Sequence, residues 1–212
     1  MDEPLSSPSA ERNREPIAAV LRRCLPAAGA VLEIASGTGE HVAWFATQFP
    51  GLVFQPSDPG RAQRASIAAS ITAAGVANIR PPLALDVAAS DWERNADIPK
   101  PLAAILCINM IHISPWAATL GLMRGAGHLL ADGGVLYLYG AYKRGGRHTA
   151  PSNAAFDASL RGQHPDWGVR DLETVTAEAD RAGFALDEVV EMPANNVSVI
   201  FRRRPAGRDQ ST

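Results

Sequence analysis

The sequence has very little lysine and cysteine, and it contains no long apolar run. Lys100 and Lys143 are the only lysines, so nearly all of the positive charge is arginine, and the net charge is −2. This balance gives no reason to expect a polyanion or an acidic membrane surface as a partner. It favours a small-molecule substrate over nucleic acid, although individual basic patches remain compatible with it.

The two cysteines, Cys24 and Cys107, lie in apolar runs and have neither metal-ligand nor redox spacing. We therefore expect two buried thiols rather than a disulfide, as is typical of a reducing cytoplasm. The N-terminus lacks the apolar stretch of a signal peptide, and the longest apolar run, residues 102–113, is too short to span a bilayer. These features predict a soluble, cytoplasmic protein.

The chain otherwise has an ordinary globular composition, with 46% hydrophobic and 20% charged residues among 212. This length fits one α/β domain with a substantial core. Residues 1–8 and 205–212 are small, polar and proline-bearing, which predicts disordered tails on both sides of a single domain at residues 9–204. There is no internal repeat and no linker long enough to separate two domains.

Within this domain, apolar strand-like runs alternate with helical patterns, which predicts a sheet covered by helices on both faces. We expect strands at residues 30–34, 52–55, a run ending at 83–86, 103–108, 135–139, 185–191 and 197–203, the last antiparallel. Helices are expected at residues 11–25, 42–48, 61–74, from Pro115 to about 130, 153–161 and 171–182, with an irregular stretch at 140–150. The predicted fold class is a Rossmann-like, doubly wound, mostly parallel sheet of seven strands.

A glycine-containing loop follows the first predicted strand, and Glu33 near the end of that strand limits what the loop can bind. Ser36, Gly37 and the helix start after it offer backbone N–H groups to a ligand. A carboxylate at position 33 would repel a pyrophosphate and favour an ammonium group. The third glycine of the dinucleotide fingerprint is also missing. A nicotinamide-dependent oxidoreductase is therefore disfavoured, while a purely structural turn stays open.

At this loop the chain resembles the class I methyltransferases, whose first motif is an acid followed by three alternating glycines. Glu33, Gly37 and Gly39 match the motif, and Ala35 stands in place of the first glycine. We expect alanine to be accommodated there by a negative φ. The resemblance implies S-adenosylmethionine as cofactor, with S-adenosylhomocysteine as its product.

Polar residues follow three further predicted strands, where ligands bind in such folds. Asp58 is placed to accept hydrogen bonds from two ribose hydroxyls, although an Asp-Pro pair is also a common turn former. Asp86 is placed to accept from an adenine amino group, and Val87 to cover the ring. Asn109 and Met110 are expected beside the methionine end of the ligand.

A closer resemblance covers nearly the whole chain. The chain looks like a methyltransferase-like subgroup long catalogued as a domain of unknown function, which implies the fold and the cofactor but no substrate. The segments that carry the likeness are residues 11–14, 33–41, 55–58, 109–114, 142–143, 151–153, 156–157, 159–161 and 167–168.

The methyl acceptor is predicted to meet residues after the fourth and fifth strands and the first helix. His112 is the candidate general base, because its ordinary pKa lies near neutrality, and Tyr142 is a candidate acceptor-side residue. Arg12 is expected to reach the cofactor's carboxylate. Two of these have a structural alternative, a packed histidine for His112 and a solvated charge for Arg12. A non-catalytic binding module on the same fold is the alternative function, and no metal site is expected.

Overall fold

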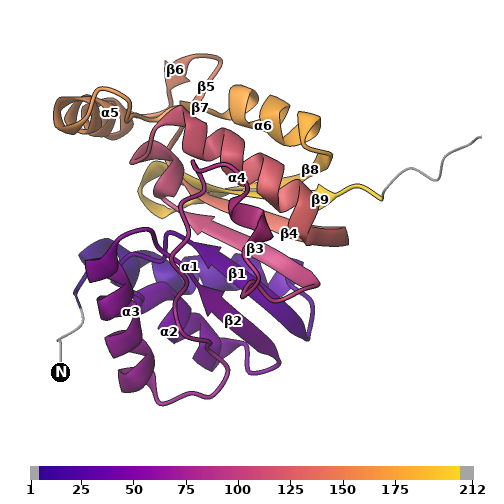
Figure 1. The fold of residues 1–212 in the computed structure, drawn as a ribbon. Helices are drawn as coiled ribbons and strands as arrows, with labels where there is room; N and C mark the ends of the chain where they lie inside the picture. The colour runs from indigo at the N-terminus through magenta and orange to yellow at the C-terminus, as the bar shows by residue number, and fades with distance from the viewer. Residues whose placement is uncertain (1–4, 206–212) are drawn as a thin grey trace, which may run out of the picture.

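The apolar runs of the sequence pair into one six-stranded sheet in the order β2–β1–β3–β4–β9–β8, which crosses the centre of Figure 1. The computed structural model describes residues 5–205. The strands are β1 (Gly29–Ile34), β2 (Leu52–Pro56), β3 (Leu102–Ile108), β4 (Leu130–Gly140), β8 (Phe184–Met192) and β9 (Asn196–Arg203). Neighbours from β2 to β4 are parallel, whereas β9 is antiparallel to both β4 and β8. The sheet is therefore mixed, and the predicted antiparallel last strand is confirmed.

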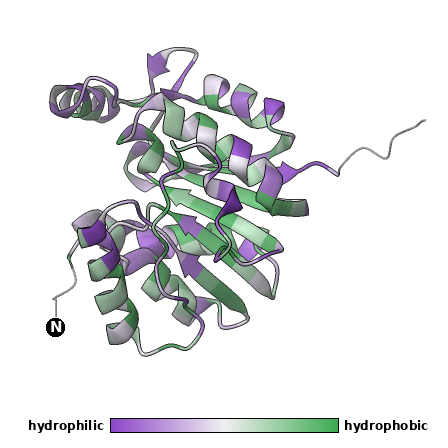
Figure 2. Ribbon diagram, viewed as in Figure 1, coloured by the Kyte–Doolittle hydropathy of each residue, from purple (hydrophilic) through white to green (hydrophobic). Residues whose placement is uncertain are grey.

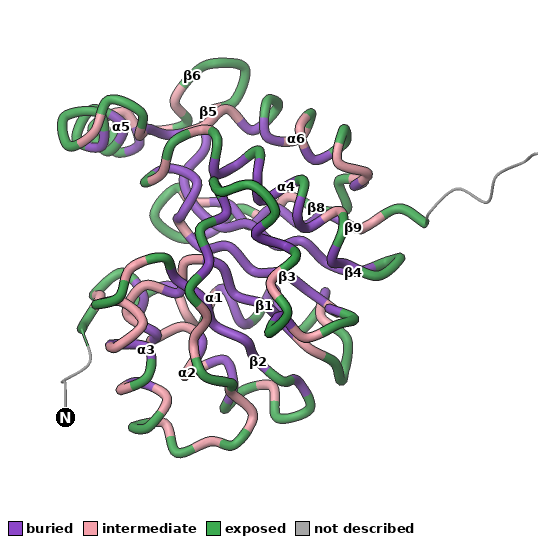
Figure 3. The backbone as a smooth tube through the Cα atoms, in the orientation of Figure 1, coloured by how far each residue is buried: buried purple, intermediate pink, exposed green. Residues whose placement is uncertain are grey.

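Helices cover both faces of this sheet, because successive side chains of a strand point to opposite faces. Val31 packs on the face covered by α1 (Pro8–Cys24), α2 (Glu40–Gln48) and α3 (Arg61–Ala74), whereas Leu32 packs on the face covered by α4 (Trp116–Leu129) and α6 (Leu172–Arg181). The strands are accordingly the most hydrophobic part of the chain in Figure 2 and are largely buried in Figure 3. The two cysteines are buried free thiols, as expected.

The predicted third strand, ending at residues 83–86, is not a strand of this sheet. The segment runs beside β2 and makes two isolated bridges, Phe54 with Ile79 and Ser57 with Leu83. Pro81 and Pro82 lie between the two bridges and have no N–H to donate, so a continuous ladder cannot form. The expected seven-stranded sheet therefore has six strands, with an irregular segment along its β2 edge.

The stretch predicted to be irregular at residues 140–150 instead contains a short hairpin, β5 (Tyr142–Arg144) with β6 (Arg147–His148). Strand β7 (Arg170–Asp171) pairs with β5, and α5 (Pro151–Gln163) lies between them in sequence. In Figure 1 this group projects beyond the two helical layers, with α5 at its outer end. We call residues 141–171 the cap.

The first helix begins at Pro8, three residues before the predicted start, because the Ser7 side chain accepts from the Ala10 N–H and caps it. The Leu5 N–H donates to Ser66 Oγ on α3. The predicted tails lie mostly outside the described residues. Within residues 5–205, no helix combines the length and apolar character needed to cross a bilayer.

Candidate functional site

A cavity of about 320 Å³ lies beside the carboxyl ends of β1, β2 and β3. This volume is in the range of small-molecule sites. Six of the residues predicted to bind the cofactor line it, namely Ala35, Gly37, Asp58, Asp86, Val87 and Met110. Lining residues not predicted from the sequence include Pro59, Gln63, Ile113, Ser114 and Ala118. Gln63 lies in the first turn of α3, and no pattern in the sequence singled it out.

Ala35 contributes to the cavity wall with a backbone that corrects our expectation. Its φ is +53°, in the left-handed region, and not negative. Gly37 and Gly39 also have positive φ values, of +57° and +84°. The loop therefore keeps the backbone path that glycine favours even where alanine replaces it, at a steric cost of about 1 kcal/mol.

Ser36 fastens the loop to the end of β2 and does not line the cavity. Its N–H donates to the Ser57 carbonyl over 2.8 Å, and its hydroxyl donates to the Glu33 carbonyl over 3.4 Å. These bonds hold the turn rigidly where a ligand would approach. In this structure Ser36 supports the loop, and its role in cofactor binding stays a prediction.

Both carboxylate oxygens of Asp58 accept hydrogen bonds from backbone N–H groups, one in the glycine loop and one in the turn after Asp58. Oδ2 accepts from the Gly37 N–H over 3.1 Å and Oδ1 accepts from the Gly60 N–H over 2.9 Å. The side chain is only 7% exposed. A carboxylate offers about four acceptor positions, so Asp58 acts as a turn former and still has capacity for two hydroxyl donors.

Glu33 lies beneath the loop and is 2% exposed. Its Oε2 has no hydrogen-bond partner among the described residues. Burial is the largest cause of a pKa raised to about 7, with the nearby Asp58 charge adding to it and a hydrogen bond with Ser36 opposing it. An ammonium group would pair with this oxygen and restore the ionised form.

The opposite side of the cavity is mostly apolar. Val87 and Met110 are buried, and Ile113 is 46% exposed at the rim. Asp86 is exposed, and its Oδ1 accepts from the Ala88 N–H over 2.9 Å. This wall suits a flat apolar ring with one hydrogen-bonding edge.

Four predicted cofactor residues lie outside the cavity lining, namely Glu33 and Ser36, which lie in and beneath the loop, and Arg12 and Asn109. Arg12 is exposed on α1. Asn109 adopts a left-handed conformation with φ of +62°, and its N–H donates to the Tyr139 carbonyl at the end of β4. Asn109 thus shapes the backbone that leads to Met110.

The predicted catalytic pair, His112 and Tyr142, is buried behind the cavity wall. His112 follows Met110 in a short 3₁₀ turn (Met110–His112) and is 0% exposed. Its ring lies edge-on to Tyr142, with 6.0 Å between centroids. Burial, with a smaller contribution from the charge of Arg170, lowers the pKa of His112 to about 4. Burial also raises the pKa of Tyr142, so both rings are neutral at pH 7.

A second histidine, to which no role was assigned from the sequence, contacts α1. His41 Nε2 is 2.7 Å from Oδ1 of the buried Asn13. Burial lowers the pKa of His41 to about 4. The His41–Asn13 contact connects α1 and α2 close to the loop.

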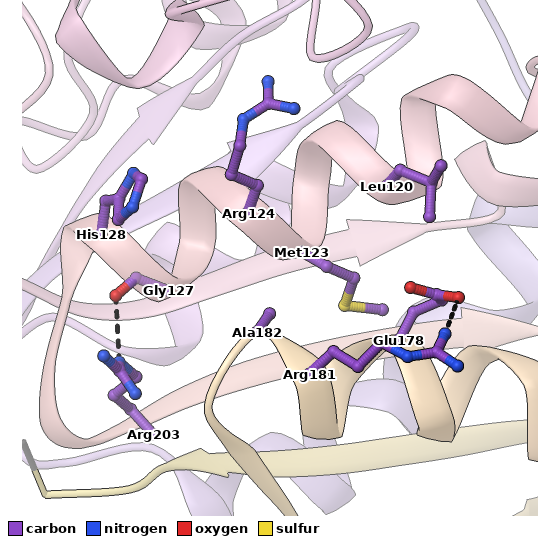
Figure 4. Close-up of a pocket in the computed structure, with 9 residues that line it drawn as sticks. All are labelled: Leu120, Met123, Arg124, Gly127, His128, Glu178, Arg181, Ala182 and Arg203. Carbon is purple, nitrogen blue, oxygen red and sulfur yellow. Dashed lines mark hydrogen bonds and ion pairs between the residues drawn. The ribbon is translucent and has the colours of Figure 1, made fainter.

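A separate groove of about 400 Å³ lies between α4 and α6 (Figure 4). It is lined by Arg124, His128, Arg181 and Arg203, among other residues, and two of the arginines already have local roles. Arg203 donates to the carbonyls of Gly127 and Gly183, and Arg181 pairs with Glu178. The last turns of both helices border the groove, so their dipoles disfavour an anion there. We find no cluster of metal-ligating side chains within residues 5–205.

Comparisons with known proteins give the family of this chain and the solved structures that share its fold. Residues 5–203 match the family described as a protein of unknown function, DUF938. The chain belongs to this family. This agrees with the predicted membership of a methyltransferase-like subgroup catalogued as a domain of unknown function. The matched residues include both the cavity and the cap.

Solved structures similar to this DUF938 chain include several methyltransferases. An O-methyltransferase family protein from Burkholderia thailandensis has a TM-score of 0.77 at 17% identity, covering 94% of this chain and 58% of its own. A putative O-methyltransferase from Nostoc punctiforme has a TM-score of 0.77 at 18% identity, covering 91% and 56%. Human N-acetylserotonin methyltransferase, solved with S-adenosylmethionine, has a TM-score of 0.72 at 11% identity, covering 92% and 53%. The DUF938 chain spans a little over half the length of these proteins and shares their methyltransferase fold.

Proposed function

We propose that this chain binds S-adenosylmethionine in the 320 Å³ cavity and transfers its methyl group to a small-molecule acceptor. The observation that carries the proposal is the unpaired, buried Oε2 of Glu33 beneath a loop that is tied to Asp58. A nucleoside with an ammonium-bearing tail satisfies both groups, whereas a pyrophosphate would face two carboxylates. The methyltransferase fold of the similar structures supports the same ligand class.

In this proposal each part of the site holds a different part of the ligand. Asp58 accepts from the ribose hydroxyls, while Asp86 and Val87 receive the adenine. Glu33 pairs with the ammonium group, and Asn109, Met110 and the more distant Arg12 surround the methionine end. Ala35, Ser36 and Gly37 supply the close-packed backbone of the loop.

S-adenosylmethionine supplies an electrophilic methyl group when it is bound. The protein's part is to align the acceptor and exclude water, and positioning alone is worth on the order of 7–11 kcal/mol. His112 is our candidate to accept a proton from the acceptor, a contribution of about 10²–10⁴-fold. Its lowered pKa keeps the imidazole neutral at pH 7, and it also makes His112 a weaker proton acceptor than a free histidine.

Isothermal titration with S-adenosylmethionine and S-adenosylhomocysteine tests this proposal. We expect both to bind with similar affinity, because the recognised groups are common to the two. The absence of heat with either ligand, in protein shown to be folded, would contradict it. Quenching of nicotinamide cofactor fluorescence on mixing would instead support an oxidoreductase.

A non-catalytic binding module is the second candidate. Ile113 at the cavity rim and Phe156 on α5 are 46% and 40% exposed, and exposed apolar side chains near a cavity suit a protein partner. A screen of small-molecule acceptors for release of S-adenosylhomocysteine separates the two candidates. Cofactor binding without turnover of any acceptor would favour the binding module.

A further inference from the structure

Three buried polar atoms that have no hydrogen-bond partner among residues 5–205 lie close together where β4 passes into the cap. They are Nδ1 and Nε2 of His112 and the hydroxyl of Tyr142. His112 is 0% and Tyr142 is 2% exposed, and their rings are in edge-on contact. Leaving a buried polar group unpaired costs about 1–3 kcal/mol, and native proteins rarely keep several of them together. The cluster therefore points to a ligand that offers a polar atom.

Gly140 decides which ring nitrogen of His112 such a ligand would meet. A Cβ at position 140 would lie 2.0 Å from Nε2, so the glycine backbone packs against that edge of the ring. Nδ1 lies on the other side of the ring. A neutral imidazole that carries its proton on Nε2 offers Nδ1 as a hydrogen-bond acceptor.

Phe156 packs against His112 and is also partly exposed to solvent. Its ring is edge-on to His112, with 6.2 Å between centroids, yet its side chain is 40% exposed. Helix α5 is held in place by the neighbouring Asp157, which pairs with Lys143 over 3.1 Å and accepts from the Val169 N–H over 2.7 Å. Outward rotation of the Phe156 side chain would therefore leave these Asp157 contacts intact.

The cations near the cluster are already engaged. Arg170 donates to the carbonyls of Ile111, Ser114 and Asp166. Lys143 and Arg161 both pair with Asp157. A negatively charged ligand would therefore gain little here, whereas an aromatic ring would gain edge-to-face contacts.

We propose that the cluster is the acceptor subsite and that it takes a flat, uncharged aromatic alcohol, which displaces the Phe156 ring and donates its hydroxyl to His112 Nδ1. This inference rests on the proposed function, because Met110 links the cluster to the cofactor cavity. The Tyr142 hydroxyl offers the ligand a second polar contact.

Binding of 2-naphthol to the full-length protein without cofactor tests the subsite directly. The side-chain ¹⁵N signals of His112, followed by NMR, should shift on titration with 2-naphthol. They should shift much less with 2-methoxynaphthalene, which cannot donate a hydrogen bond, and with the anion 2-naphthoate. Equal binding of naphthol and its methyl ether, or no His112 shift with naphthol, would overturn the proposal.

Two variants sharpen the experiment. Phe156→Ala removes the group that must be displaced and should tighten 2-naphthol binding at least about threefold. Leu186→Ala, a 45% exposed apolar residue on β8, is the matched control and should leave binding unchanged. Unchanged or weaker binding in Phe156→Ala would contradict the displacement.

Titration of the same samples with S-adenosylmethionine separates this inference from the proposed function. Naphthol binding at His112 without cofactor binding would retain the subsite and remove the methyltransferase proposal. Cofactor binding without naphthol binding would retain the function and remove this acceptor class.

Discussion

Ala35 holds a left-handed backbone, with φ of +53°, at the turn where β1 enters the cavity loop. Because Cβ crowds the carbonyl oxygen in this conformation, alanine costs roughly 1–2 kcal/mol there relative to glycine. We expect Ala35→Gly to raise the free energy of unfolding by about 1 kcal/mol, after the greater chain entropy of glycine is allowed for. Urea denaturation measures the change.

The control for this substitution is Ala19→Gly on the exposed face of α1. Glycine in a helix interior should lower the free energy of unfolding by about 1 kcal/mol. The two variants are thus predicted to change stability in opposite directions. A loss of stability in both would mean that position 35 does not need a left-handed conformation.

Glu33 should make stability depend on pH in an unusual direction for a carboxylate. Burial raises its folded pKa from 4.5 to about 7, so the folded state binds more protons than the unfolded state between these values. Its contribution to the free energy of unfolding therefore falls as pH rises through this window, by on the order of 3 kcal/mol. Glu33→Gln should remove that fall.

Denaturation of wild type and Glu33→Gln at pH 5 and pH 8 measures the difference. Comparing the two proteins is necessary because burial lowers the pKa of His41 and His112, which gives pH dependence of the opposite sign. The variant should gain stability relative to wild type on going to pH 8. An equal difference at both pH values would contradict a buried Glu33 with a raised pKa.

Asp58 should be the acid on which cofactor affinity depends most. Asp58→Asn replaces a charged acceptor of the ribose hydroxyls, and hydrogen bonds to charged groups are worth about 1.5–3 kcal/mol. We expect S-adenosylhomocysteine affinity to fall at least about tenfold in isothermal titration. Asp97→Asn, at an exposed position outside the cavity lining, should bind like wild type. Wild-type affinity in Asp58→Asn would remove this residue from the site.

At the scale of elements, α2 and α3 meet at Gly39. A Cβ there would lie 2.7 Å from the Ile67 Cα, and φ is +84°. Gly37→Ala is a matched comparison, because its φ is also positive but a Cβ would meet nothing within 4 Å. We expect Gly39→Ala to destabilise the protein by at least about 1 kcal/mol more than Gly37→Ala, since overpacking adds to backbone strain. Equal melting temperatures of the two variants would show that α2 and α3 move apart enough to accommodate the added Cβ.

The amphipathic helices and apolar strands were predictable because each one's hydrophobic pattern matches the face it buries. The helix at Arg61–Ala74 has the predicted limits, and β1 and β3 differ from prediction by one residue at their starts. The prediction of a strand ending at residues 83–86 was wrong, because two prolines interrupt the pairing of this segment with β2. The cap hairpin was missed because two short strands leave no hydrophobic period to read.

The candidate site was predictable only as a set of residue types after strand ends. The sequence indicated that Glu33, Asp58 and Asp86 share one edge of the sheet, because parallel strands end together. It did not indicate that Ala35 has a positive φ or that His112 is enclosed by Tyr142 and Phe156. Those properties depend on contacts between residues far apart in the chain.

At the scale of the whole molecule, the chain combines the fold of larger methyltransferases with a cap inserted between β4 and α6. It spans 53–58% of the similar structures named above. In our proposal the cavity beside the ends of β1, β2 and β3 binds the cofactor. The cluster of His112 and Tyr142, where β4 passes into the cap, binds the acceptor. The groove between α4 and α6 takes no part in this account (Figure 4).

A crystal structure with S-adenosylhomocysteine tests the central claim most directly. The account predicts the ribose hydroxyls on Asp58, the adenine against Val87, and the amino group paired with Glu33 Oε2. A ligand bound elsewhere, such as in the groove between α4 and α6, or one whose amino group lies away from Glu33, would contradict it.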